Sequence, residues 1–325
     1  MKFRTEIDIA PFESKIEYSS HILCMGSCFA SVIGERLSRA RFSCEVNPTG
    51  VLFNPISVAS TLERFGGGSH VEQEEFVESK GVWFHYGMHG SLSDVSPQEA
   101  AAKVNRAVEQ GCNALDRADW VILTLGSAWV YRLCESGEVV VNCHKQPARL
   151  FDRELLSVDE VTATLRALLS GVLRGKRVIL TVSPIRHLAD GLEQNSLSKA
   201  ILRVAIDGVV REFDGVYYFP SYEILMDDLR DYRFYAEDML HPSGVAADYI
   251  WQHFSAALFS DSTQRQYDTI DRVVKATQHR PMRRYSQEHV AFCRANLKLI
   301  NQIKGVDLSS ERGYFEGELA EIDKK

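Results

Sequence analysis

Five short apolar runs are spread along the chain, and amphipathic segments separate them. The runs predict buried strands, and the segments between them predict helices. The run DWVILTLGS has no polar alternation, which is typical of a strand covered on both faces. The predicted strands are 21–25, 41–46, 119–127, 176–184 and 215–220, and the predicted helices are 29–39, 56–65, 96–118, 157–173, 195–213 and 241–259.

This alternation of strands and helices indicates an α/β fold. Strands joined through a helix pair in parallel, because the connection crosses over the sheet. We therefore predict a three-layer α/β/α sandwich around a mostly parallel five-stranded sheet, within residues 1–260. Two segments depart from the pattern: the glycine-rich stretch after residue 65 is predicted to run over the surface, and 128–147 is predicted to form a hairpin that turns at Ser136–Gly137.

The last part of the chain, residues 261–325, has a different pattern. It predicts two polar helices that are separated at Pro281. We expect this C-terminal helical appendage to pack on the outside of the main domain or against a second copy of the chain, in a homodimer.

The overall composition narrows the class of protein. The 325 residues are 45% hydrophobic and 25% charged, which are ordinary values for a globular protein. A formal net charge of −7 argues against nonspecific binding to nucleic acid, which depends on clustered Lys and Arg. No uncharged apolar run approaches the ~18 residues needed to span a bilayer, and the first residues contain no signal-peptide core. We expect no membrane partner and a cytoplasmic location.

The cysteines and histidines do not indicate a metal site. Seven cysteines are scattered without a C-x-x-C pair, so neither a zinc knuckle nor a redox dithiol is predicted. His85 and His89 are four residues apart, but they lie in an irregular glycine-containing stretch rather than on a predicted helix. We therefore expect no metal and no other cofactor.

The turn Gly26–Ser27–Cys28 joins the first predicted strand to the first predicted helix. Ligands of doubly wound sheets bind at the carboxyl ends of the strands, so this turn is a candidate site. Ser27 is either the helix cap, a role that serine often takes, or a nucleophile. Cys28 is the alternative nucleophile, because a thiol at a helix N-terminus has a lowered pKa. We expect the Cys28 side chain to point toward the helix interior.

A candidate base for such a nucleophile lies in the stretch DMLHPS. Asp238 and His241 are three residues apart, so in a turn their side chains can lie on the same side. The carboxylate would then accept a hydrogen bond from Nδ1 of His241 and leave Nε2 to take a proton from Ser27. Arg186 and His187 follow another predicted strand and are expected to line the same pocket.

These motifs carry a resemblance to known families. A nucleophile turn near the N-terminus, with Asp-x-x-His before the last helix of the sandwich, resembles the SGNH (GDSL-type) hydrolase superfamily, whose sheet is flavodoxin-like. More narrowly, GSCFA at 26–30 resembles the motif that names the GSCFA family. Further blocks similar to that family's, in its order, are NPTGVLFNP, LTLGSAWVY, NCHKQP, TVSPIRH, FPSYEI and DLRDYRFYAEDMLHPSG. The resemblance covers roughly residues 1–260.

This resemblance implies a catalytic triad and an activity. Ser27 would be the nucleophile, His241 the general base and Asp238 the carboxylate that orients it. The implied function is a serine esterase that hydrolyses a small acyl group, such as acetyl, from a carbohydrate-like or other polar alcohol through an acyl-enzyme. Two alternatives are an O-acyltransferase that uses the same site and a catalytically silent binding module on the same fold.

The resemblance also implies an oxyanion hole, with one departure from the superfamily. Its donors there are the amide of the nucleophile turn, a glycine after the second strand and an asparagine after the third. Gly50 corresponds to that glycine, with Asn47 in the same turn. After the third strand this chain has Gly126–Ser127–Ala128 where the superfamily has Gly-x-Asn, so one donor is lacking. Asn142 and His144 in the following hairpin are the candidates to replace it.

Overall fold

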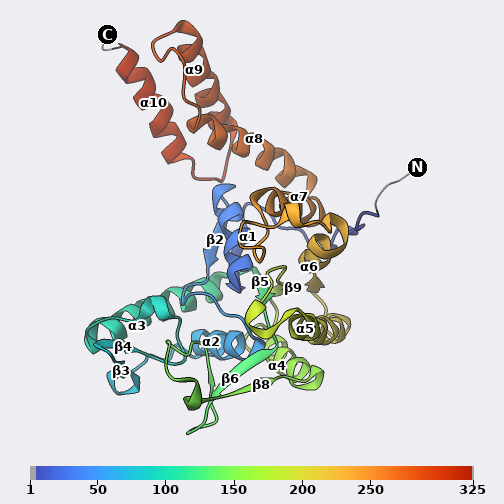
Figure 1. Cartoon of the computed structure of the whole chain (residues 1–325). Coiled ribbons are helices and arrows are strands. Elements are labelled where there is room, and N and C mark those ends of the chain that lie inside the picture. Colours follow the sequence, from blue (N-terminus) through green and yellow to red (C-terminus); the bar gives the residue numbers. More distant parts are fainter. Residues whose placement is uncertain (1–4, 324–325) are drawn as a thin grey trace.

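The computed structural model of the chain describes residues 5–323, and a five-stranded sheet lies at its centre (Figure 1). Its strands are β1 (His21–Gly26), β2 (Ser43–Val46), β5 (Trp120–Leu125), β9 (Arg177–Val182) and β10 (Val216–Tyr218). They lie in the order β10–β9–β5–β1–β2, and every neighbouring pair is parallel. The predicted α/β fold with a parallel five-stranded sheet is confirmed.

Helices cover both faces of this sheet. They are α1 (Cys28–Arg39), α2 (Pro55–Gly67), α3 (Pro97–Arg117), α4 (Val158–Ser170), α5 (Leu192–Glu212) and α7 (Gly244–Leu258). Buried residues of α1 and α7 pack in one hydrophobic cluster, and those of α2, α3, α4 and α5 pack in another. The three layers of the sandwich follow from this division.

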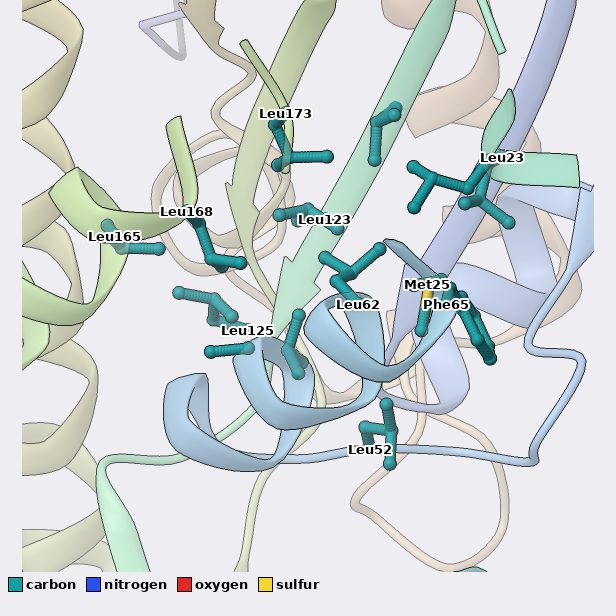
Figure 2. Packing of buried hydrophobic residues seen from close by; sticks show 14 of the residues in the cluster. Leu23, Met25, Leu52, Leu62, Phe65, Leu123, Leu125, Leu165, Leu168 and Leu173 are labelled. Carbon is teal, nitrogen blue, oxygen red and sulfur yellow. The ribbon is translucent and has the colours of Figure 1, made fainter. Parts of the chain in front are cut away.

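The side chains of β1 show why the sequences of the central strands are continuous apolar runs. Successive side chains of a strand point to opposite faces of the sheet. Leu23 and Met25 pack in the cluster of α2 to α5 (Figure 2), whereas Ile22 and Cys24 pack in the cluster of α1 and α7. Both sets are buried, so neither face of the strand needs polar residues.

The strand order indicates where on this sheet a ligand is expected to bind. Counted along the chain within this sheet, the strands lie in the order 2-1-3-4-5, which is the flavodoxin-like order. The winding of the chain reverses between β1 and β5. Ligands of open α/β sheets bind outside the carboxyl ends of the strands at that reversal. The turn Gly26–Cys28 follows β1, and Gly126 follows β5.

The segment between β5 and α4 is more ordered than the predicted hairpin. It contains β6 (Trp129–Leu133), β7 (Val139–Val140) and β8 (Phe151–Leu155), and β6 pairs antiparallel with both of the others. The predicted hairpin is thus part of a three-stranded sheet. β8 was not predicted, because its sequence FDREL contains three charged residues and so lacks an apolar pattern. The strand forms because its backbone pairs with β6. The irregular stretch after α2 includes a short hairpin of β3 (Val77–Ser79) and β4 (Val82–Phe84).

In the described part of the chain, the C-terminal residues form three helices rather than the predicted two. These are α8 (Asp261–Thr277), α9 (Gln287–Gln302) and α10 (Ser309–Asp323), and Pro281 lies between the first two. The sequence of α10 contains Gly313 and Gly317, which weaken a helix signal. Its Phe315 is nevertheless fully buried in a small core that the three helices share, and α9 and α10 project away from the sandwich (Figure 1).

No helix within residues 5–323 combines the length and the apolar character that crossing a membrane requires.

Candidate active site

A cavity of about 550 Å³ lies at the carboxyl ends of the central strands. Five parts of the chain build its wall: the start of α1, the residues before α2, the sheet of β6 and β7 with the loop after it, the loop after β9, and the turn before α7. The lining residues are Cys28, Phe53, Asn54, Ser127, Trp129, Tyr131, Val140, Val141, Asn142, Cys143, Ile185, Arg186, His187, Leu188, Ala189, Leu240 and His241.

The turn before α7 holds Asp238 and His241 together. Nδ1 of His241 lies 2.6 Å from Oδ2 of Asp238. The other carboxylate oxygen accepts hydrogen bonds from the backbone N–H groups of His241 and Leu240, at 3.0 and 2.9 Å. These two backbone bonds and the imidazole lower the pKa of Asp238 to about 2, so it is ionised at neutral pH. With Nδ1–H directed at the carboxylate, Nε2 of the neutral imidazole can accept a proton.

Gly26 sets the path of the turn between β1 and α1. Its φ is +128°, and a Cβ on it would lie 2.1 Å from the backbone oxygen of Thr124 in β5. Its N–H donates to Oδ1 of Asn47 at 2.9 Å, and its carbonyl accepts from the N–H of Leu52 at 2.8 Å. The chain therefore passes too close to β5 for any residue with a side chain.

Ser27 lies beneath this turn as the N-cap of α1. Its Oγ accepts a hydrogen bond from the N–H of Phe29 at 3.3 Å, and the residue is only 1% exposed. Its Cβ lies 3.2 Å from the point that a Cβ on Gly126 would occupy. Ser27 is not among the residues that line the cavity, and its hydroxyl shares no hydrogen bond with His241 in the described structure.

Cys28, the first residue of α1, does line the cavity. The residue is half-buried, and its side chain also packs against the hydrophobic cluster of α1 and α7, in line with the expectation that it points toward the helix interior. The thiol forms no disulfide. Burial raises its pKa, and a backbone hydrogen bond opposes this shift. The structure thus brings Cys28 and His241, rather than Ser27 and His241, to one cavity.

Most of the oxyanion donors suggested by the sequence are used inside the fold. The N–H groups of Gly126 and Ser127 both donate to the carbonyl of Phe53, at 2.7 and 2.9 Å. The N–H of Gly50 donates to the carbonyl of Asn47 at 2.8 Å, and the side-chain amide of Asn47 is hydrogen-bonded at both ends. Asn47, Gly50 and Gly126 are absent from the cavity wall and instead shape the turns behind it.

Of the two residues suggested as replacements for the missing donor, the structure brings only Asn142 to this cavity. Its Oδ1 accepts a hydrogen bond from the N–H of His144 at 2.7 Å. His144 lines an adjoining cavity, where its ring stacks on Phe84 and its Nε2 lies 3.0 Å from the carbonyl of His85. His144 is therefore occupied away from the turn that carries Cys28.

Asn54 is a site residue that the sequence interpretation missed. It is the N-cap of α2, and its Oδ1 accepts a hydrogen bond from the N–H of Ser57 at 2.8 Å. Asn54 also lines the cavity, and its Nδ2 has no protein partner among the residues that the structure describes. An asparagine before a helix signals a cap, and only the tertiary fold shows that Asn54 lines the same cavity as Cys28 and His241.

Two buried nitrogen atoms of the wall also lack a protein partner within residues 5–323: Nε2 of His187 and Nε1 of Trp129. Burial lowers the pKa of His187 to about 4, with smaller contributions from Lys199 and His241, so its imidazole is neutral at pH 7. Buried polar groups are normally hydrogen-bonded. The wall therefore offers polar groups to a bound molecule or to water.

Arg186 connects the loop after β9 to the turn that presents the imidazole. Its N–H donates to the carbonyl of Leu240 at 3.2 Å, one residue before His241. Its guanidinium lies 4.1 Å from the ring centroid of Tyr235. These contacts hold the Asp238–His241 turn against the end of the sheet.

Lys199 of α5 is a buried cation behind the site. Its Nζ donates to the carbonyls of Gly126 and Ser183, at 2.6 and 2.8 Å, and thereby links the residues that follow β5 and β9. Burial lowers the pKa of Lys199 to about 7. The charged form is thus held by two carbonyl groups in a place where desolvation opposes it.

This buried lysine predicts a stability that rises with pH. The unfolded chain binds the Lys199 proton up to about pH 10.5, whereas the folded chain releases it from about pH 7. Between these values the unfolded state binds more protons, so the free energy of unfolding increases as the pH rises. Urea denaturation at pH 7 and pH 9 should show this increase for the wild type and a smaller one for Lys199→Met.

Lys176→Met is the control for this measurement, because Lys176 also donates to a backbone carbonyl, that of Ala118, but is only partly buried. It should keep the pH dependence of the wild type. A Lys199→Met protein whose stability still rises as steeply would contradict the assignment.

Two family models match the chain. A model described as the GSCFA family matches residues 21–254, and a model described as the C-terminal domain of GSCFA domain proteins matches residues 270–321. No curated protein and no solved structure matches the chain. The first match includes β1, the turn that follows it and the Asp238–His241 turn, and the second falls within the C-terminal helices.

Proposed function

Because the chain belongs to the GSCFA family, we propose that it hydrolyses esters through an acyl-enzyme formed at the turn between β1 and α1. The proposed substrates carry a small acyl group, such as acetyl, on a carbohydrate-like or other polar alcohol. We also assign the sandwich to the SGNH superfamily. The 2-1-3-4-5 strand order and the Asp-x-x-His turn before α7 support that assignment.

One observation carries the proposal. The imidazole of His241 is oriented by an ionised carboxylate, and it lies on a cavity that the start of α1 also lines. A base that is oriented in this way and faces a nucleophile is the arrangement that acyl transfer requires. Surface ion pairs are common, but this pair lies at the carboxyl ends of the strands, beside the topological reversal of the sheet.

The reaction follows from the groups on the wall. The nucleophile of the turn attacks the ester carbonyl while His241 takes its proton, and the alcohol then leaves with that proton. Water, activated by His241, releases the acid. Nδ2 of Asn54, a donor without a protein partner within residues 5–323, would stabilise the oxyanion together with the start of α1, because a helix N-terminus favours negative charge.

Hydrolysis of p-nitrophenyl acetate and of acetylated sugars tests the proposal, with butyryl and octanoyl esters as the size series. Added acceptor alcohols distinguish transfer to an alcohol from transfer to water. A folded protein that turns over none of these esters or acceptors would contradict the proposed function.

The variant Asn54→Ser is expected to lower kcat by about 10²–10³-fold, because it removes one donor to the oxyanion. Serine is also a good N-cap, so α2 should keep its cap and the thermal midpoint should change little. The rates of ester hydrolysis and the unfolding temperature provide the measurement. The comparison variant is Asn142→Ala; if it loses more activity than Asn54→Ser, the donor is Asn142.

A further inference from the structure

We propose that the nucleophile of this site is the thiol of Cys28 and that Ser27 serves only as the cap of α1. The inference deepens the proposed function and rests on it, because it names the atom that carries the acyl group. The acyl-enzyme is then a thioester. This assignment to Cys28 differs from the sequence resemblance, which implies that Ser27 is the nucleophile.

The position of Ser27 opposes a nucleophilic role. Its Oγ accepts a hydrogen bond from the N–H of Phe29, and the residue lies against Gly126 with 1% of its surface exposed. Attack from this position would require the hydroxyl to leave the cap and the turn to open. Two backbone hydrogen bonds hold the same turn: the N–H of Ser27 donates to the carbonyl of Thr124 in β5 at 2.9 Å, and the carbonyl of Gly26 accepts from the N–H of Leu52 at 2.8 Å.

The position of Cys28 favours the role, because Cys28 lines the same cavity as His241. Cys28 is half-buried, lines the cavity that His241 and Asn54 also line, and is the first residue of α1. The start of the helix favours a thiolate there, but burial outweighs this effect and raises the pKa of the thiol. Cys143 lines the same cavity but lies in the loop after β7, away from any helix start, so it supplies a matched comparison.

The raised pKa of Cys28 defines how the reaction begins. Burial keeps the thiol protonated at neutral pH, so attack needs a base. The sulfur forms a bond to the carbonyl carbon as its proton passes to Nε2 of His241. The carbon–oxygen bond of the ester then breaks, and the alcohol leaves with the proton from His241. Water next attacks the thioester, gives its proton to His241, and releases the acid while the thiol is restored.

The first experiment locates the acyl group. Protein mixed with p-nitrophenyl acetate is quenched in acid, and the acetylated peptide is identified by mass spectrometry. The acetyl group is expected on Cys28 and should be removed by neutral hydroxylamine, as a thioester is. Ser27→Ala should still form this adduct despite a weakened helix cap, whereas Cys28→Ala should form none and lose roughly 10³-fold or more in kcat/KM. Acetylation of Ser27, or turnover by Cys28→Ala at the wild-type rate, would overturn the inference.

A second experiment does not depend on ester turnover. Iodoacetamide should alkylate Cys28 of the wild-type protein and of Cys143→Ala, and His241→Ala should slow the alkylation of Cys28 at neutral pH by about tenfold or more, since the base that accepts its proton is missing. Equal rates with and without His241 would overturn the inference even if no ester is turned over. A protein that hydrolyses esters through Ser27 would retain the proposed function and lose only the assignment to Cys28.

Discussion

Replacement of His241 by alanine is expected to lower kcat for p-nitrophenyl acetate by roughly 10³–10⁴-fold. The imidazole is the proposed proton acceptor on the cavity wall, and its Nδ1 lies 2.6 Å from Oδ2 of Asp238. Without it, neither the nucleophile nor the attacking water can pass its proton to a positioned base. Steady-state rates at neutral pH provide the measurement, and circular dichroism shows that the variant is folded.

His253→Ala is the matched control for this variant. His253 lies on α7, a few turns after His241, and is not among the residues that line the cavity. It should turn over the ester at the wild-type rate. The companion variant Asp238→Asn keeps the shape of the carboxylate but removes its charge, and a loss of about 10²-fold or more is expected because the imidazole is less well oriented and its cation less stabilised. Full activity of His241→Ala would contradict the catalytic role of this turn.

Replacement of Gly26 by alanine is expected to lower the free energy of unfolding by about 4 kcal/mol or more. Only a few mechanisms cause a loss of stability of this size. Two of them act at this position. The φ of +128° is strained for any residue with a Cβ, and the new Cβ would lie 2.1 Å from a backbone oxygen of β5. Since β1 and β5 are adjacent central strands, neither backbone can yield without breaking the parallel ladder between them.

Urea denaturation of soluble protein, or its absence from the soluble fraction, provides the measurement. Gly244→Ala is the control, because a Cβ on this first residue of α7 meets no atom within 4 Å. That substitution should leave the stability unchanged or raise it by about 0.5 kcal/mol. A Gly26→Ala protein as stable as this control would show that the turn between β1 and α1 is less constrained than the contacts indicate.

The sequence by itself determined the features that depend on neighbouring residues. Apolar runs between amphipathic segments indicated the five parallel strands, because burial on both faces leaves no polar alternation in a strand. The three-residue spacing of Asp238 and His241 indicated that the two side chains can meet, because that contact lies within a single turn. The motifs along the chain also indicated the GSCFA family.

Only the tertiary structure decided which atoms of the turn face the cavity. Ser27 and Cys28 are adjacent in the sequence, yet the fold buries Ser27 and places Cys28 among the residues that line the cavity. Asn54 and α10 were missed for a related reason. The amide of Asn54 reaches the site only because α2 packs beside β1, and α10 holds its form because Phe315 is buried by two other helices. Such contacts join residues far apart in the chain, so no local pattern records them.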